Sequence, residues 1–106
     1  MKAAKFDYTR PQDVRAAIQA LADAKGDGKF LAGGQSLGPM LDLRLTRPKL
    51  LVVVSRIESL RSIAVVNGSI RIGAAVTHAE IEDAGALLAR NAMLPAVARE
   101  IAYRTI

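Results

Sequence analysis

Cysteine and tryptophan are absent from this chain of 106 residues, and other aromatic residues are few. Without cysteine the chain forms no disulfide, thiolate metal site, iron–sulfur ligation or cysteine nucleophile. Its one histidine, His78, stands alone in the first turn of an expected helix, which argues against a metal site. With two Phe and two Tyr, the core must consist mainly of Leu, Ile, Val and Ala. The lack of cysteine agrees with the cytoplasmic location that we expect.

Long hydrophobic runs are also absent. The longest unbroken aliphatic run extends from Leu50 to Val54, far less than a membrane-spanning helix requires. The first residues, Met1 to Asp7, lack the apolar segment of a signal peptide. We therefore expect no membrane span. The composition, 51% hydrophobic and 24% charged, is that of a globular chain able to bury a core.

Acidic residues are outnumbered, so that the formal net charge is +5. Between residues 44 and 61 a single acid, Glu58, accompanies five cations: Arg44, Arg47, Lys49, Arg56 and Arg61. A basic stripe of this kind suits an anionic cofactor, an acidic partner or nucleic acid, or simply keeps the chain soluble. We expect no nucleic acid partner, because the aromatic side chains on which bases stack are nearly lacking.

The first half of the sequence begins with a strand pattern followed by a helix pattern. Ala4, Phe6 and Tyr8 alternate with polar residues, as in a short strand. A helix is then expected to begin with Thr9 as its N-cap, and Gln12, three residues later, would complete a capping box. The helix would present one apolar face, formed by Val14, Ala17, Ile18 and Leu21.

The alternation of strand and helix then continues to about residue 55. The chain turns at residues 25–28, and the short apolar segment 29–32 predicts a buried strand. Residues 33–36 form a loop and residues 37–45 a short helix. The β-branched run 50–54 is typical of an interior parallel strand. This order predicts a small parallel sheet with right-handed crossovers.

The second half predicts a β-hairpin. Residues 62–66 and 69–72 flank Asn67-Gly68, a dipeptide that supplies the positive φ angles of a type I′ turn. An isolated hairpin is marginal in water and needs further strands or a helix to cover it. We therefore expect the chain to be a fragment, or a partner to complete its sheet. A homo-oligomer joined through the unfinished sheet would satisfy the same need.

Helices are expected after the hairpin. Thr77 and Glu80 form a capping box that opens one helix, and helical character continues over residues 84–90. The apolar face of a last helix would consist of Leu94, Val97 and Ile101.

The segment that carries chemistry is the loop at residues 31–38, between a predicted strand and a predicted helix. Paired glycines, Gly33 and Gly34, admit backbone angles that other residues resist and leave room for a ligand. Successive amides can then point inward as an anion nest, and Ser36 adds a hydroxyl in position to cap the helix. Together these features suit a phosphate or a pyrophosphate.

This loop matches neither of two common phosphate-binding motifs. Gln35 stands where the dinucleotide fingerprint G-x-G-x-x-G needs its second glycine, and Pro39 replaces the lysine of the Walker A motif. Ser36 lacks the G-x-S-x-G context of a serine hydrolase. A turn without a ligand is therefore the alternative interpretation of this segment.

Three motifs follow one another along the chain. They are Lys-Phe-Leu-Ala-Gly-Gly-Gln-Ser-Leu at 29–37, Leu-Arg-Leu with Arg-Pro at 43–48, and Arg-Ile-Gly-Ala with Thr-His-Ala-Glu at 71–80. Together they resemble the FAD-binding domain of molybdopterin dehydrogenases, which has the PCMH-type FAD-binding fold. That family includes the medium subunits of aerobic carbon monoxide dehydrogenase and the flavin domains of xanthine dehydrogenase-like hydroxylases.

The resemblance implies an α+β (α/β) fold in two parts. Residues 1–55 would form a small parallel βαβ subdomain that binds the FAD pyrophosphate. Residues 56–106 would begin an antiparallel-sheet subdomain, with a hairpin and helices. In the family a second glycine motif, Thr-Ile-Gly-Gly, comes shortly after the position of Ile106. The chain is therefore expected to be truncated and, by itself, inactive.

The resemblance also implies which residues bind FAD. Backbone amides of the loop would wrap the pyrophosphate, with secondary contacts beside it. The residues concerned are Ala32, Gly33, Gly34, Gln35 and Ser36 in the loop, Lys29, Leu31 and Leu37 beside it, and Ile101 and Ala102 toward the adenine. No catalytic or metal-binding residue is implied, because flavin electron transfer needs positioning rather than an acid, base or nucleophile.

As a function, the resemblance implies the FAD-binding subunit of a molybdenum hydroxylase, which passes electrons from iron–sulfur clusters through FAD to an external acceptor. Its partners would be a molybdopterin-binding large subunit, where the organic substrate is oxidised, and a 2Fe–2S small subunit. Two alternatives stay open. One is the FAD domain of another PCMH-type flavoenzyme, and the other is a basic binding module without enzymatic activity.

Overall fold

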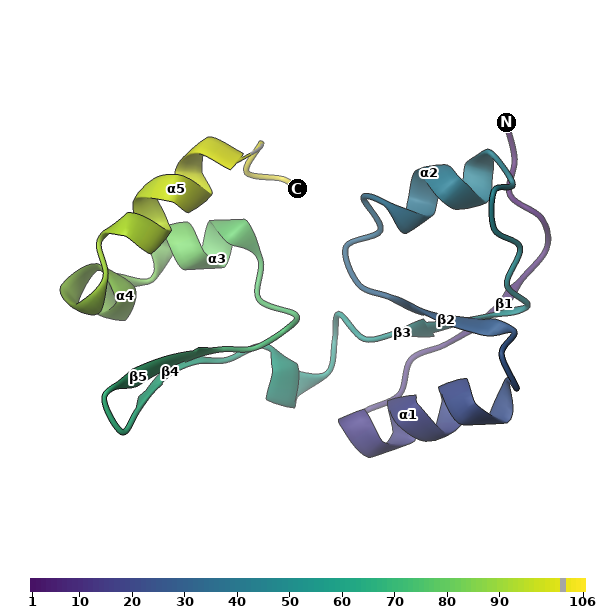
Figure 1. Cartoon of the computed structure of the whole chain (residues 1–106), viewed down its shortest axis with the longest axis horizontal. Helices are drawn as coiled ribbons and strands as arrows, with labels where there is room; N and C mark the ends of the chain where they lie inside the picture. The colour runs from purple at the N-terminus through teal and green to yellow at the C-terminus, as the bar shows by residue number, and fades with distance from the viewer. Residues whose placement is uncertain (102) are drawn as a thin grey trace. The chain divides into compact units, whose positions relative to one another are not determined.

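The computed structural model describes residues 1–101 and 103–106, which fold into two compact units (Figure 1). The first unit extends over Met1–Ser59 and the second over Leu60–Ile106. A short 3-10 helix, η1 (Glu58–Leu60), spans the boundary. None of the helices in the described part of the chain is long and apolar enough to cross a membrane.

A three-stranded parallel sheet forms the centre of the first unit. β1 (Asp7–Thr9), β2 (Gly28–Leu31) and β3 (Leu50–Val53) lie in the order β1-β3-β2. On the central strand, Leu51 is 1% and Val52 0% exposed. This burial on both faces confirms the prediction of an interior parallel strand, because parallel strands are covered on both sides by their crossover helices.

Two helices provide that cover. α1 (Val14–Asp23) connects β1 to β2, and α2 (Leu37–Asp42) connects β2 to β3. They lie on opposite faces of the sheet (Figure 1). The predicted alternation of strand and helix around a parallel sheet is therefore confirmed.

The predicted start of α1 is wrong. Thr9 does not cap the helix, because it is the last residue of β1 and pairs in register with Val52. The N-cap is Asp13, whose carboxylate accepts a hydrogen bond of 2.7 Å from the amide of Ala16. Pairing with β3 keeps the chain extended through Thr9, so that the helix begins only after Pro11.

The expected apolar face of α1 is only partly buried. Ala17 lies in the core, whereas Val14 and Ile18 are exposed. The helix packs on β2 and β3, and a three-stranded sheet is too narrow to cover the whole apolar stripe of the helix.

The prediction of a buried strand at residues 29–32 is also wrong. β2 is an edge strand, and Phe30 on it is 45% exposed. Lys29 is exposed as well. A short apolar run between glycines does not distinguish an edge strand from a central one, because only the strand order decides how many neighbours cover it.

The second unit contains the predicted β-hairpin. β4 (Ile63–Val66) and β5 (Ser69–Ile72) pair in antiparallel register. Asn67 and Gly68 connect them with φ angles of 51° and 77°. Both positive values are those of a type I′ turn, which confirms the interpretation of the Asn-Gly dipeptide.

Three helices follow the hairpin: α3 (His78–Asp83), α4 (Gly85–Arg90) and α5 (Met93–Ile101). α5 packs against α3 and α4. The capping box that opens α3 is confirmed, because the Thr77 side chain accepts from the amide of Glu80 and the Glu80 carboxylate accepts from the amide of Thr77.

The predicted apolar face of α5 is wrong at two of its three positions. Val97 and Ile101 are 50% and 53% exposed, whereas Pro95 and Ala98 are buried. The helix carries apolar residues around most of its circumference, so that several stripes compete. Packing against α3 and α4 selects the stripe with the smaller side chains, which lets the helices approach closely.

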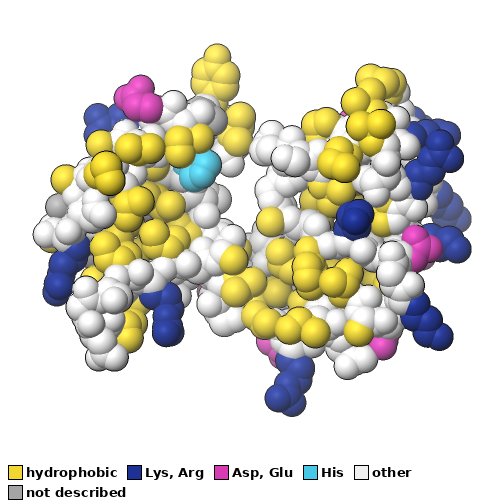
Figure 2. Space-filling view, viewed as in Figure 1, with side chains coloured by type: hydrophobic (Ala, Val, Ile, Leu, Met, Phe, Trp, Pro, Cys, Tyr) yellow, Lys and Arg dark blue, Asp and Glu magenta, His cyan; other side chains and the backbone are white. Residues whose placement is uncertain are grey.

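Both units leave large hydrophobic side chains at their surfaces, as the yellow areas of Figure 2 show. Examples are Ile18 and Leu45 in the first unit and Met93 and Tyr103 in the second. Contiguous apolar surface of this kind is typical of regions that contact other protein segments or ligands.

Candidate functional site

The glycine loop, residues 32–37, lies at the carboxyl end of β2 and leads into α2 (Figure 1). Its two ends are fixed by backbone hydrogen bonds. Before the loop, the carbonyl of Leu31 accepts from the amide of Val54 at 2.9 Å, which holds the end of β2 beside β3. After it, the amide of Gly38 donates to the carbonyl of Gly34 at 2.7 Å. The loop therefore projects from a fixed scaffold, at the sheet edge where open α/β proteins bind ligands.

Five consecutive amides of this loop have no internal partner. No hydrogen bond within residues 1–101 and 103–106 uses the N–H groups of Gly33, Gly34, Gln35, Ser36 and Leu37 as donors. Backbone N–H groups are strong donors that require a partner, either solvent or a ligand. A run of free amides can bind an anion with several oxygens, such as a pyrophosphate.

The loop is also open. A Cβ atom added at Gly33 would meet no atom within 4 Å, so that the space above this residue is free. Gly34 has a φ of +76°, a left-handed conformation that side chains resist. Ala32, Gln35 and Ser36 are exposed. The loop is thus accessible at Gly33 and at these three residues.

Ser36 differs from the expectation in one respect. It occupies the N-cap position of α2, but its side chain makes no capping hydrogen bond. Its backbone is helical (φ −98°, ψ −49°) rather than extended, and an extended backbone is what usually lets an N-cap side chain reach the helix amides. The prediction that the Ser36 hydroxyl caps α2 is therefore wrong.

The predicted site residues belong to different parts of the chain. Leu31 and Leu37 border the loop, and both are half-buried. Lys29 instead lines a groove with Asp27 and Arg47, near the amino-terminal ends of β2 and β3. Ile101 is the exposed last residue of α5, in the second unit, and Ala102 lies outside the described residues.

A groove that the sequence did not predict lies beside the loop. Ala32 and Gly38 form one part of its wall, and Arg10 and Arg56 form another. The two arginines come shortly after the carboxyl ends of β1 and β3. Because the strands are parallel, their carboxyl ends meet at the edge where the loop lies. Position after a predicted parallel strand is the signal that could have identified both arginines.

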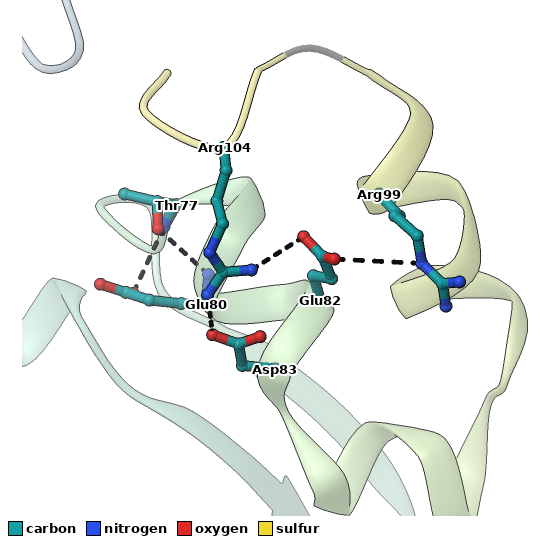
Figure 3. A network of polar contacts seen from close by, with 6 residues as sticks. All are labelled: Thr77, Glu80, Glu82, Asp83, Arg99 and Arg104. Atoms are coloured by element: carbon teal, nitrogen blue, oxygen red, sulfur yellow. Dashed lines mark hydrogen bonds and ion pairs between the residues drawn. The ribbon is translucent and has the colours of Figure 1, made fainter.

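An ionic network in the second unit joins residues of α3 and α5 to Arg104, which follows α5 (Figure 3). Arg104 donates to a carboxylate oxygen of Glu82 at 3.0 Å and also pairs with Asp83. Arg99 lies 3.9 Å from the other carboxylate oxygen of Glu82. The hydrogen bond from Arg104, and then its charge, lower the pKa of the Asp83 carboxyl, and Asp83 in turn raises the pKa of Arg104. These contacts tie the segment after α5 to α3.

Potential metal ligands are not clustered in the part of the chain that the structure describes. No group of three or more His, Cys, Asp or Glu side chains there could hold a metal ion. His78, the one histidine, is an exposed residue in the first turn of α3.

The parallel sheet, the free amides and the open glycine loop define a domain suited to a phosphate-bearing cofactor. The family described as the FAD binding domain in molybdopterin dehydrogenase matches residues 4–106 of this sequence. The chain belongs to this family, whose cofactor is FAD. The free amides of the loop fit the pyrophosphate of that cofactor.

Two relatives illustrate the similarity. The chain is 38% identical, over 106 residues, to the 6-hydroxypseudooxynicotine dehydrogenase complex subunit alpha of Paenarthrobacter nicotinovorans; the match covers 100% of the chain and 36% of the relative. It is 35% identical over 98 residues to the carbon monoxide dehydrogenase medium chain of Hydrogenophaga pseudoflava, covering 92% of the chain and 34% of the relative. The chain thus spans little more than a third of the length of these relatives.

Solved structures agree with the fold. Carbon monoxide dehydrogenase from Hydrogenophaga pseudoflava superposes with a TM-score of 0.92 at 34% identity, over 97% of this chain and 36% of that one. Quinoline 2-oxidoreductase from Pseudomonas putida 86 gives a TM-score of 0.92 at 34% identity, over 99% and 38%. The predicted α+β fold, a parallel sheet followed by an antiparallel one, is confirmed.

Proposed function

We propose that the glycine loop of this chain binds the pyrophosphate of FAD through its backbone amides. The observation that carries the proposal is the run of five amides, from Gly33 to Leu37, without a partner in the described residues. Each can donate to a phosphate oxygen, and hydrogen bonds to an ionised acceptor are stronger than those between neutral groups. The additional FAD contacts predicted for Lys29, Leu31, Leu37, Ile101 and Ala102 belong to the same proposal.

The chain's own contribution to catalysis is to position the cofactor. FAD, when bound, supplies the redox chemistry that connects iron–sulfur clusters to an external electron acceptor. The glycine loop holds the cofactor by its diphosphate and leaves the flavin ring to be placed by other contacts. No acid, base or nucleophile is needed for this role.

The wider assembly in this proposal is a molybdenum hydroxylase. The names of the relatives support it, because they designate a subunit of a dehydrogenase complex and a medium chain. The partners would be a molybdopterin-binding large subunit and a 2Fe–2S small subunit, in the cytoplasm. Co-purification of the protein from its native cells, with molybdenum and iron analysis of the complex, tests these partners, and cell fractionation tests the location.

Flavin binding is tested by blocking the loop. Gly33→Val places a branched side chain in the open space beside the loop backbone. It should weaken FAD binding at least about tenfold in a fluorescence titration of the purified protein. The matched control is Gly85→Val, because a Cβ at Gly85 also meets nothing within 4 Å and Gly85 lies in α4. Unchanged FAD affinity in Gly33→Val, with both variants folded by circular dichroism, would contradict the proposal.

A further inference from the structure

The groove beside the glycine loop has an apolar floor and a cationic rim. It encloses about 430 Å³ between the sheet and α2. The floor includes Leu31, Leu51 and Val53, and the rim carries Arg10 and Arg56. Its volume lies in the range of pockets that hold small ligands, roughly 300 to 1,000 Å³.

The charge of this groove sets it apart from two other grooves of the first unit. Among the described residues that line it there is no Asp or Glu. The groove around Lys29 contains Asp27, and a third groove, lined by the end of α1 and by residues of β1 and β3, contains Asp7, Asp23 and Asp27. The groove beside the loop therefore attracts anions, whereas the other two have mixed charge or an excess of negative charge.

Both rim arginines are free to bind a ligand. Neither Arg10 nor Arg56 has a hydrogen-bond or ion-pair partner among residues 1–101 and 103–106. Arg10 is nevertheless held in place, because its guanidinium lies 5.5 Å from the ring centroid of Tyr8. Stacking on a ring leaves the donors at the edge of the guanidinium available for phosphate oxygens.

The groove combines three features: an apolar floor, the aromatic ring of Tyr8 and two guanidinium groups. Together they suit a ligand that carries both a planar ring and a phosphate. A planar heteroaromatic ring would rest on the aliphatic floor and beside Tyr8, and a phosphate attached to it would reach Arg10 or Arg56. Ala32 and Gly38 belong to the same groove, so that a ligand in it would continue directly into the glycine loop.

We propose that Arg10 and Arg56 extend the glycine loop into a subsite for one mononucleotide half of FAD, its ring on the apolar floor and its phosphate at the rim. This inference rests on the proposed binding of the FAD pyrophosphate by the loop. The shared chemistry of the two halves, a planar ring and a phosphate, is what the groove recognises. AMP and FMN represent the two halves as separate probes.

The test removes the two charges and leaves a shorter, neutral polar side chain at each position. The double variant Arg10→Gln/Arg56→Gln should bind FAD about tenfold more weakly than the unmodified protein, because charge-assisted hydrogen bonds to phosphate are lost. The matched control is Arg15→Gln/Arg71→Gln, which changes the net charge equally at exposed arginines outside the groove. The control should retain the affinity for FAD.

Separate titrations with AMP and FMN identify the half that occupies the subsite. Weaker binding of AMP in the groove variant assigns the adenylate half, and weaker binding of FMN assigns the flavin half. Affinities for FAD, AMP and FMN equal to those of the control variant would overturn the subsite. If Gly33→Val then still abolishes FAD binding, the role of the loop stands and only the subsite fails; if the unmodified protein binds none of the three, both proposals fail.

Discussion

The two units use their charged side chains differently. In the second unit, three of five arginines form ion pairs: Arg61 with Glu80, Arg99 with Glu82, and Arg104 with Glu82 and Asp83. The first unit has ten Lys and Arg against six Asp and Glu, yet its one ion pair among the described residues joins Lys49 to Asp27. Charge in the second unit thus supports its own structure, whereas charge in the first remains available to an anionic ligand.

Two glycines show the same contrast in the backbone. Gly73 follows β5, and a Cβ at this position would lie 2.1 Å from the carbonyl oxygen of Leu60. Gly33 has open space instead. Gly73 therefore permits close packing of two chain segments, whereas Gly33 leaves space that a ligand can occupy.

The largest effect is expected for Gly73→Ala. The new methyl group would overlap the backbone of Leu60, and the free energy of unfolding should fall by about 3 kcal/mol or more. Gly33→Ala, in open space, should change it by less than about 1 kcal/mol. Urea denaturation followed by circular dichroism measures both, and equal losses would remove the contrast between the two glycines.

A smaller loss of stability is expected for Gly34→Ala. Its φ of +76° lies in the left-handed region, where a side chain costs about 1 to 2 kcal/mol. The control is Gly38→Ala, since Gly38 has open space and no positive φ. The same denaturation experiment distinguishes them. Should Gly34→Ala prove as stable as Gly38→Ala, the loop would not have the conformation that exposes its amides.

Each unit also has one helix cap that can be removed. Thr77→Ala in the second unit and Asp13→Ala in the first should each cost about 1 kcal/mol, because a side-chain hydrogen bond to a helix amide is lost. Thr9→Ala should cost less, since Thr9 caps no helix. If Thr9→Ala instead destabilised the protein as much as Asp13→Ala, α1 would begin earlier than the structure shows.

The smallest effect concerns pH and the contact of Arg104 with Asp83. The pKa of Asp83 is lowered in the folded state, so its contribution to stability is present at neutral pH and is lost as the pH falls below the ordinary carboxyl range. Arg104→Gln should therefore be slightly less stable than the unmodified protein at neutral pH and equally stable near about pH 2. Arg71→Gln, at an exposed position on β5, is the control. Denaturation curves at both pH values, at low salt, measure the difference in the free energy of unfolding between the variant and the unmodified protein. If this difference persists in acid, it does not come from the ion pair of Arg104 with Asp83.

Local sequence signals predicted the elements that depend on few neighbours. The Asn67-Gly68 turn, the capping box at Thr77 and the interior strand around Leu51 are all present. The errors at Thr9 and on α5 arise where tertiary contacts decide. Pairing with β3 extends the chain through Thr9, and packing against α3 and α4 chooses which face of α5 is buried.

The candidate site shows the same division. The sequence identified the glycine loop, because paired glycines between a strand and a helix are a local signal. It did not show that the amides of Gly33 to Leu37 lack internal partners, which depends on the fold around them. The sequence also did not show that Arg10 and Arg56 line the same groove, since these residues are far apart along the chain.

The most direct test of the account is an amide NMR titration of the isotope-labelled protein with FAD and, separately, with inorganic pyrophosphate. We expect the largest shifts of amide resonances at Gly33, Gly34, Gln35 and Ser36 with both ligands, because these N–H groups would donate to the diphosphate. Binding of FAD that leaves these four resonances unmoved would contradict the central claim.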